Sequence, residues 1–363
     1  MDLAILGQGT ALPEHFIGQA ESVKYAAEYF SQTDEQRRML PLLYRMSGVK
    51  RRFSVLLDGP EGTPNRHSAF PVPTDSSDLG PSIGYRMRLY ERESTPLALR
   101  ASQQALEQSR LSPADITHLV TVSCSGFAAP GVDIALIKGL GLAPTVQRTH
   151  VGFMGCHGAM NGMRVAHGFA GSDPTARILL CAVELCSLHY HYGWNPEHIV
   201  ANALFSDASA ALVARARDEA EDGAWCVSAS GSCLIPDSED AMTWRIDDHG
   251  FTMSLSARVP DLIGRHLRGW VASWLGQNGL TSTEIKTWAV HPGGPRILTA
   301  VADALELPKD ALSVSRDVLR EYGNMSSPTI LFILERLRRE NAARPCVALG
   351  FGPGLVAEAL LFT

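Results

Sequence analysis

One cysteine lies in a setting that suits a nucleophile. Cys156 follows the small and apolar residues 151–155, and residues 160–166 after it have the spacing of a helix with one apolar side. The sequence therefore places Cys156 at or just before a helix N-terminus, where unpaired backbone N–H groups and the helix dipole favour a thiolate. The alternative is a structural role, because free cysteines are among the most buried residues.

An internal repeat is the main guide to the fold. Residues 106–116 resemble residues 275–285, and both segments have the pattern of a helix, a turn, an acidic residue and a strand. Residues 152–156 correspond to residues 323–327 at nearly the same offset, and each is followed by a helix and then by a buried strand. The repeat predicts an α/β fold made of two duplicated β-α-β halves.

The two halves are expected to span residues 1–225 and 226–363. Hydrophobic patterning also predicts individual elements. Strands are expected at 3–6, 116–122 and 176–185, helices at 19–44 and 85–109, and an irregular surface segment at 58–82.

A histidine and an asparagine of the second half are the candidate partners of the thiol. His291 and Asn324 come from loops that correspond to loops bordering Cys156. If a pseudo-two-fold axis relates the halves, the three side chains converge on one cleft. His291 is then a base or cation partner for the thiolate, and the two residues together form a donor pair for the oxyanion of an acyl transfer. Without the duplication, the alternative interpretation is structural: His291 would be an ordinary loop histidine, and Asn324 would be a turn residue with left-handed backbone angles.

The composition excludes several classes of protein. The 363 residues are 45% hydrophobic and 19% charged, which is typical of one or two globular domains with an ample core. A net charge of −6 disfavours nucleic-acid and anionic-membrane binding. The sequence contains no run of 18 apolar residues, so we expect no membrane span. The seven cysteines lack regular spacing and the N-terminus does not have the pattern of a signal peptide, so we expect a cytoplasmic protein.

Three further patterns have both a functional and a structural interpretation. Residues 7–9 form a Gly-x-Gly, but the third glycine is missing and Pro13 interrupts the expected helix, so we expect no dinucleotide site. The basic residues Lys50, Arg51 and Arg52 form either a solvated surface cluster or a clamp for phosphate groups. A third set resembles metal ligands, but strand alternation scatters its side chains and we expect no metal site. Its members are Cys181, Cys186, His189 and His191.

Several motifs, taken in this order and at these separations, resemble the type III polyketide synthases, the chalcone synthase family of the thiolase-like condensing enzymes. They are Cys124-Ser125-Gly126, Gly152-Phe153-Met154-Gly155-Cys156, Ala203-Leu204-Phe205-Ser206-Asp207-Ala208, His291-Pro292-Gly293-Gly294-Pro295, Tyr322-Gly323-Asn324-Met325-Ser326-Ser327 and Gly350-Phe351-Gly352-Pro353-Gly354. The resemblance covers nearly the whole chain. It implies a thiolase-like five-layered αβαβα fold and a homodimer.

The resemblance also implies a reaction. Cys156 would hold an acyl starter, taken from acyl-CoA, as a thioester. Malonyl-CoA would lose carbon dioxide, and its enolate, stabilised by His291 and Asn324, would extend the starter before the chain cyclises. CoA thioesters would be substrates, and no cofactor is implied.

The family pattern assigns further residues to the substrate. Phe205 matches the gatekeeper between the CoA tunnel and the cavity, and Gly352 belongs to a loop that shapes the cavity wall. Glu184, Cys124 and Ser326 match positions that hold a water for cyclisation. Gly293, Gly294 and Arg296 fall where the family lines the CoA tunnel, with Lys50, Arg51 and Arg52 as substitutes for plant basic residues.

Departures from the plant enzymes bear on the product. Met253 replaces a second gatekeeper Phe, Trp244 replaces a Gly that faces the cyclisation pocket, and Ala129 replaces a Met that crosses the dimer interface. Trp244 and residues 184–188 look more like bacterial alkylresorcinol and alkylpyrone synthases. We therefore expect a fatty acyl starter. A thiol at Cys124 is a poorer hydrogen-bond partner than a hydroxyl, which favours an α-pyrone over a resorcinol.

Three other functions fit parts of the sequence. An initiating 3-oxoacyl-carrier-protein synthase has the same Cys-His-Asn set and acts once. A non-catalytic member would keep the fold as a dimerisation or partner-binding scaffold. A thioester hydrolase would use the thiol without any condensation.

Overall fold

The first strand, β1 (Leu3–Ala11), lies at the centre of the main sheet. The computed structural model describes residues 1–217 and 223–363. Within those residues the sheet has nine strands. In spatial order they are β11 (Thr287–Val290), β12 (Cys346–Gly352), β13 (Val356–Phe362), β8 (Cys226–Leu234), β1, β7 (Asp207–Ala216), β6 (Arg177–Leu185), β4 (His118–Ser123) and β5 (Gln147–Gly152).

The sheet consists of two halves joined at β1. This strand pairs antiparallel with β7 along its length, but with β8 only at Leu3 and Ala4. In the first half β4 runs parallel to β5 and β6, and in the second half β11 runs parallel to β12. The expected boundary at residue 225 falls directly before β8.

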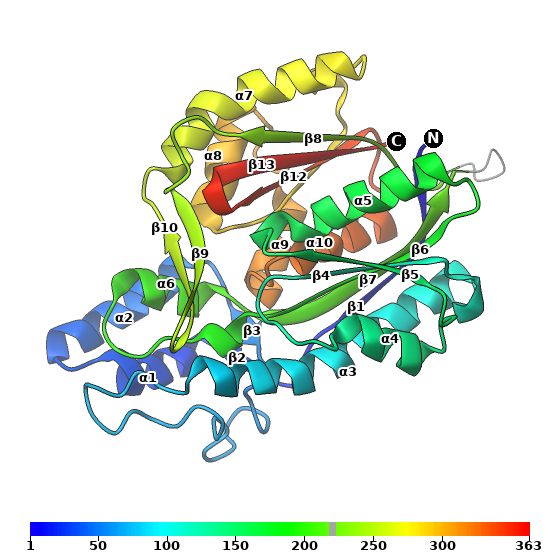
Figure 1. Cartoon of the computed structure of the whole chain (residues 1–363). Coiled ribbons are helices and arrows are strands. Elements are labelled where there is room, and N and C mark those ends of the chain that lie inside the picture. The colour runs from blue at the N-terminus through cyan, green and yellow to red at the C-terminus, as the bar shows by residue number, and fades with distance from the viewer. Residues whose placement is uncertain (218–222) are drawn as a thin grey trace.

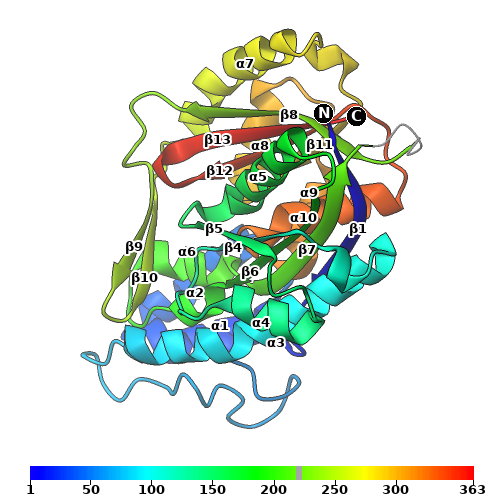
Figure 2. The same cartoon turned by 45° about the vertical axis from the view of Figure 1, so that its right-hand side comes forward.

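Helices cover both outer faces of the halves and fill the space between them (Figures 1 and 2). The helices α5 (Gly158–Ser172) and α10 (Pro328–Arg339) lie between the two halves, in a core that both halves share. The first half is covered by α3 (Ile83–Ser109) and α4 (Val132–Leu140), and the second by α7 (Val259–Gln277) and α8 (Pro295–Ala304). The expected five-layered αβαβα arrangement is confirmed.

Smaller elements surround the end of the sheet where β4 and β11 finish. The helices are α1 (Gln19–Phe30), α2 (Asp34–Met46), α6 (Pro196–Leu204) and α9 (Ser313–Tyr322). The short strands are β2 (Phe16–Gly18), β3 (Arg51–Phe53), β9 (Met242–Asp247) and β10 (Gly250–Leu255), of which β9 and β10 form a hairpin. Of the 3₁₀ turns in the described ranges, η1 (Pro113–Asp115) and η4 (Ser282–Glu284) lie at the opposite end, before β4 and β11 begin. The others are η2 (Gly155–His157), η3 (Cys186–His189) and η5 (Pro353–Leu355).

Equivalent capping interactions reproduce the sequence repeat in the structure. Ser112 and Asp115 form a capping box around η1, directly before β4. Thr281 and Glu284 form the same box around η4, directly before β11. Each box satisfies backbone N–H groups at the turn, so both copies use the same local interactions to begin a strand.

The helix expected over residues 19–44 is two helices. Chain direction changes at residues 31–33, where Thr33 caps α2 and Gln36 completes a capping box. The sequence contains this Thr-x-x-Gln signal, and a continuous apolar pattern concealed it. The irregular segment expected at 58–82 contains no helix or strand.

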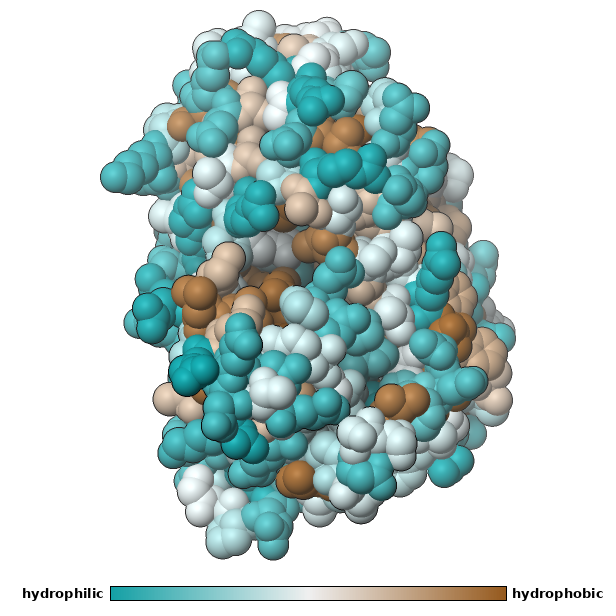
Figure 3. Space-filling model, turned by 90° about the vertical axis from the view of Figure 1, so that its left-hand side faces the viewer, coloured by the Kyte–Doolittle hydropathy of each residue, from teal (hydrophilic) through white to brown (hydrophobic). Residues whose placement is uncertain are grey.

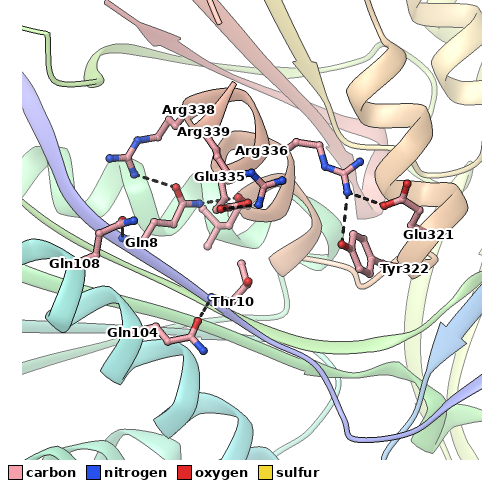
Figure 4. Close-up of polar contacts among 11 residues, drawn as sticks. Gln8, Thr10, Gln104, Gln108, Glu321, Tyr322, Glu335, Arg336, Arg338 and Arg339 are labelled. Carbon is pink, nitrogen blue, oxygen red and sulfur yellow. Dashed lines mark hydrogen bonds and ion pairs between the residues drawn. The ribbon is translucent and has the colours of Figure 1, made fainter. Parts of the chain in front are cut away.

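The Gly-x-Gly at residues 7–9 lies inside β1. Both glycines are needed because α3 packs closely against this strand. A Cβ at Gly7 would lie 2.1 Å from the Ala105 carbonyl oxygen, and one at Gly9 would lie 2.2 Å from that of Ala101. Figure 4 shows the side chain of Gln8 directed the other way, toward α10. It donates to the Leu331 carbonyl at 2.6 Å. Two layers therefore meet at this strand.

None of the helices in the described ranges combines the length and apolar character that a membrane span requires.

A matched pair of glycine substitutions tests this packing. Gly7→Ala is expected to lower the free energy of unfolding by about 1–3 kcal/mol, because the added methyl group meets backbone atoms of α3. Gly168→Ala is expected to raise it by up to about 1 kcal/mol, because Gly168 is exposed within α5 and a Cβ there meets no atom within 4 Å. Urea unfolding measures both, and equal effects would contradict the explanation.

Candidate active site

Cys156 lies in η2, between the end of β5 and the start of α5. Two residues with positive φ, Phe153 at 61° and Gly155 at 67°, turn the chain out of the strand. A Cβ at Gly155 would lie 2.5 Å from Pro353 Cδ, so only glycine allows this close approach. The cysteine therefore stands at a helix N-terminus, as the sequence analysis expected.

Asn324 directs its amide nitrogen toward this thiol. Its Oδ1 accepts a hydrogen bond from the Ser326 backbone N–H at 2.8 Å, which leaves Nδ2 facing Cys156 Sγ at 4.0 Å. The backbone of Asn324 is held as well, because its N–H donates to Leu204 and its carbonyl accepts from Ser206, both at 2.9 Å. The amide is therefore oriented as a donor.

The end of α9 that leads to Asn324 is anchored from α10. Arg336 Nη2 lies 2.7 Å from Glu321 Oε2 and 3.5 Å from the Tyr322 hydroxyl (Figure 4). Gly323, which ends α9, has a φ of 75°, and a Cβ there would lie 2.9 Å from the Leu204 carbonyl oxygen. The loop thus follows one path into the site.

His291 follows β11 and is almost completely enclosed. It is 1% exposed, and its backbone N–H donates to Leu349 at 2.8 Å. Neither ring nitrogen has a hydrogen-bond partner among the described residues. Burial, together with a smaller effect of His157, the residue after Cys156, lowers the pKa of the imidazole to about 3. The ring is therefore neutral and has two unused polar atoms.

The thiol is also neutral in the empty site. Burial raises the pKa of Cys156 to about 11, although hydrogen bonding from Ser326 and Asn324 lowers it in part. An isolated thiolate or an isolated imidazolium is disfavoured here, because each charge loses its hydration. Transfer of a proton from the thiol to the imidazole would form both charges at once, and their attraction would offset part of this penalty.

Cys156 lines a partly open space, the catalytic cavity, whose volume is about 370 Å³ with open solvent included. Trp244 and Met253 lie opposite each other in the β9–β10 hairpin and form one wall. The Trp244 indole N–H donates to the Cys124 carbonyl at 2.8 Å, which fixes the ring. The other lining residues are Cys124, Gly155, Cys186, Phe205, Met242, Thr243, Ser326 and Pro353.

Two further cavities adjoin it, and Phe205 lines all three. The middle cavity, of about 430 Å³, shares Cys186, Trp244 and Met253 with the catalytic cavity. The inner cavity, of about 530 Å³, lies between α1, β3 and the segment 54–70. It shares further residues with the middle cavity, namely Arg52, Ser187 and Tyr190.

Glu184 lies behind the cavity wall and holds loops of both halves. It is fully buried and does not line the three cavities. Its carboxylate accepts from the backbone N–H groups of Cys124 and Ser125, the Ser125 hydroxyl at 2.6 Å and the Ser327 hydroxyl at 2.6 Å. Burial raises the pKa of this carboxyl group, and these hydrogen bonds oppose the rise.

The expected basic cluster at residues 50–52 does not form on the surface. Lys50 is exposed, but Arg51 stacks over the rings of Phe16 and Phe53. Arg52 is 7% exposed and lines the inner and middle cavities. Alternation along β3 turns these neighbouring side chains to opposite sides.

Gly352 and Ala129 also lie away from the cavities. A Cβ at Gly352 would lie 2.4 Å from His157 Nε2, so this glycine leaves room for a buried imidazole while its neighbour Pro353 forms the cavity wall. Ala129 is exposed beside Phe127, which is 67% exposed. The resemblance predicts that residue 129 contacts the cavity of a second chain across a dimer interface.

Residues 293–296 lead from His291 to the surface. Gly293 and Gly294 precede α8, and Arg296 is exposed in a hollow between α7 and α8. A Cβ at Gly48 would lie 2.9 Å from Pro295 Cγ, so the end of α2 adjoins this loop.

Sequence reasoning missed the roles of Arg52 and of His157. His157 is 3% exposed, and its Nδ1 lies 2.7 Å from Asn161 Oδ1, one helical turn further along. Asn161 in turn donates to Glu358 at 3.0 Å. The i, i+4 spacing of His157 and Asn161 was the available signal, but the third member comes from β13 and cannot be read from local spacing.

Removal of the Glu184 charge tests its structural role. Glu184→Gln is expected to lower the free energy of unfolding by about 1–3 kcal/mol, because one oxygen cannot accept from all the donors that surround it. Glu306→Gln, at an exposed ion pair, is the control and should change it by less than about 1 kcal/mol. An unchanged stability in Glu184→Gln would contradict this role.

Comparisons with known proteins agree with this geometry. The family described as chalcone and stilbene synthases matches in its N-terminal domain at residues 2–217 and in its C-terminal domain at residues 227–363. The alpha-pyrone synthesis polyketide synthase-like Pks18 of Mycobacterium tuberculosis is 32% identical, over 99% of this chain and 90% of that protein. The 1,3,6,8-tetrahydroxynaphthalene synthase of Streptomyces peucetius is 35% identical, over 97% of this chain and 90% of that protein.

Solved structures give the same result. PKS-I from the brown alga Ectocarpus siliculosus has a TM-score of 0.92 and 30% identity, and the match covers 99% of this chain and 98% of that one. The C-terminal type III polyketide synthase domain of Steely1 from Dictyostelium has a TM-score of 0.89 and 26% identity, over 100% and 99% of the two chains. This chain therefore belongs to the chalcone and stilbene synthase family and is a type III polyketide synthase, an acyltransferase.

Proposed function

We propose that the chain condenses malonyl-CoA onto a fatty acyl starter held on Cys156 and releases an alkylpyrone. The observation that carries the starter assignment is the series of cavities that leads from the thiol past Phe205 into the inner cavity. Their walls are mainly apolar, including Leu56, Leu57 and Phe70 in the inner cavity. A long alkyl chain fits such a path better than a short aromatic group.

Loading begins with a proton transfer. Cys156 passes its proton to His291 and attacks the thioester carbonyl of the acyl-CoA, and the CoA thiolate leaves. Asn324 Nδ2, already oriented as a donor, and the protonated His291 stabilise the oxyanion of the tetrahedral intermediate. The acyl group is then held as a thioester on Cys156.

Extension uses the same two donors. Malonyl-CoA loses carbon dioxide, and the electron pair of the broken C–C bond forms an enolate whose oxygen faces His291 and Asn324. The enolate carbon attacks the acyl thioester, and Cys156 leaves as a thiolate. A closed, dry site strengthens these hydrogen bonds and protects the enolate from premature protonation.

The wall near Cys124 favours lactone formation. Cys124 Sγ lies 3.5 Å from the Ser326 hydroxyl, and a thiol orders a water poorly. The oxygens of Glu184 already accept from the loops around them. Few acceptors are then left to activate a water for hydrolysis and aldol closure. The Mycobacterium relative is named for alpha-pyrone synthesis, which agrees with this assignment.

CoA would enter between the end of α2 and the start of α8. Lys50 and Arg296 are exposed there and would bind its phosphate groups, while Gly293 and Gly294 would allow the pantetheine arm to pass. Figure 3 shows hydrophobic side chains beside a hollow on the face that carries α2. On that helix Met39, Leu42 and Met46 are exposed.

The homodimer would form on the face around Ala129. Phe127, Phe153 and Met154 are exposed there, at 67%, 59% and 44%, beside the edge strand β5. Exposed aromatic groups and an unpaired strand edge are typical of a surface that another chain covers. The seven free cysteines, including the nucleophile, suit a reducing cytoplasm.

Incubation with malonyl-CoA and a panel of acyl-CoAs tests the function. Wild type is expected to form alkylpyrones from C8 to C16 starters, and Cys156→Ala should form none, as read by mass spectrometry. Faster turnover of p-coumaroyl-CoA would contradict the fatty starter, and a mainly resorcinolic product would contradict the lactone. Single condensation onto a carrier protein would indicate the initiating synthase, and a lack of malonyl-CoA decarboxylation with any starter would indicate a scaffold.

The pH dependence of Cys156 alkylation tests the proton transfer. In His291→Ala the thiol has lost its base, so iodoacetamide labelling should need a higher pH than in wild type, where burial already raises the pKa of Cys156. Wild type should react at lower pH because His291 takes the proton. Peptide mapping separates Cys156 from the other cysteines.

Asn324→Leu is the matched variant for this measurement. It keeps the base, so its labelling profile should follow wild type, while condensation should fall by about 10²–10³-fold through loss of one oxyanion donor. Superimposable labelling profiles of wild type and His291→Ala would rule out His291 as the base.

A further inference from the structure

We propose that the inner cavity is a binding site for the far end of the starter acyl group, and that Arg52 recognises an oxygen-bearing end there, best a carboxylate. This inference rests on the proposed function and adds to it the chemistry of the starter's far end. An ω-carboxyacyl-CoA would then be a better starter than a methyl-ended one of equal length.

Arg52 has unused hydrogen-bond donors in a buried position. Its side chain donates from Nη2 to the Ser22 hydroxyl at 2.7 Å. Its Nε is buried and has no partner, and Arg52 forms no ion pair with any described residue. A guanidinium carries five N–H donors, and leaving them unpaired away from water is unfavourable. An acceptor atom in the adjoining cavity would satisfy them.

The carboxylate of Asp207, which feels the charge of Arg52, is already satisfied by other groups. Burial raises the pKa of Asp207 to about 6, and hydrogen bonds and the charge of Arg52 oppose the rise. Its oxygens accept from the Val55 N–H at 2.9 Å, the Ser187 N–H at 2.7 Å and the Ser187 hydroxyl at 2.5 Å. Asp207 therefore balances the charge of Arg52 at a distance without using its N–H groups.

A second polar atom in the inner cavity also lacks a partner. His67 lines this cavity, and its buried Nε2 forms no hydrogen bond with any residue that the structure describes. Burial lowers the pKa of His67 to about 4, so the ring is neutral, and it lies tilted against Tyr25 with 3.9 Å between the ring centroids. A few convergent polar groups in a mainly apolar pocket are characteristic of a ligand site.

The position of this site restricts the ligand to a long chain. Among these three cavities, the middle cavity and the side chain of Phe205 lie between the inner cavity and the catalytic cavity. A group bound to Cys156 reaches Arg52 only with its far end. A guanidinium binds a carboxylate by charge-assisted hydrogen bonds, which are about twice as strong as neutral ones.

Binding to an inactive protein tests the site apart from turnover. In a Cys156→Ala background, calorimetry would measure Kd for pairs of acyl-CoAs of equal length, from C8 to C16, with a methyl or an ω-carboxyl end. We expect the ω-carboxyl member to bind about tenfold tighter or more at the length that reaches Arg52. Arg52→Met should remove this preference, and Arg92→Met, at an exposed arginine of α3, should retain it.

Arg52→Lys is a second variant in case Arg52→Met does not fold, because lysine keeps the positive charge and lacks the buried Nε–H. It should bind the ω-carboxyl member several-fold more weakly than the parent, with unchanged binding of the methyl-ended member. Equal affinity for both ends at every length, or a preference that survives Arg52→Met, would overturn the proposal. Polyketide formation by wild type would stand in that case, whereas its absence with every starter would refute the proposed function.

Discussion

A single buried carboxylate joins the two halves of the chain at the catalytic wall. Glu184 comes from β6 of the first half, and it accepts from the loop after β4 and from Ser327 of the second half. Ser327 lies three residues after Asn324, so the same anion that orders the Cys124 loop also fixes the segment that carries the amide donor. Without this carboxylate, several buried donors from both halves would have no acceptor.

The enclosure that this wall creates determines the electrostatics of the reaction. Burial disfavours a lone charge on Cys156 and a lone charge on His291, since it raises the pKa of the thiol and lowers that of the imidazole. The proposed transfer of one proton from the thiol to the imidazole suits such a site, because the net charge does not change. The Oδ1 of Asn324 is committed to the Ser326 N–H, so only its donor side faces the thiol. The site is prepared for developing negative charge before a substrate enters.

Local sequence signals predicted the parts of the site that the repeat generates. Cys156 was expected at a helix N-terminus, and it lies in η2 directly before α5. His291 and Asn324 were expected to converge on it because their loops correspond to loops that border Cys156, and the amide nitrogen of Asn324 does face the thiol at 4.0 Å. The repeat predicted the two β-α-β halves, and the family resemblance implied the five layers. The break between α1 and α2 was missed, although its Thr33–Gln36 capping box was present, because an apolar pattern ran across it.

Features that depend on contacts between distant segments could not be predicted. Arg52 is buried because the short strand β3 turns it toward α1, and a basic triplet contains no sign of this. Gly352 looked like a cavity residue, and only the packing of His157 shows why a side chain is excluded there. The position of Ala129 depends on a second chain, so its effect on the cavity stays a prediction. Sequence patterns report periodicity, whereas these roles arise from packing.

Intact-protein mass spectrometry with peptide mapping tests the central claim most directly. After incubation with an acyl-CoA alone, the account predicts one acyl group per chain, bound to Cys156. When malonyl-CoA is added, the bound chain should grow by two carbons at a time, and Asn324→Leu should both load and extend the starter more slowly than wild type. Acylation at another residue, or a Cys156 adduct that never grows, would contradict the account.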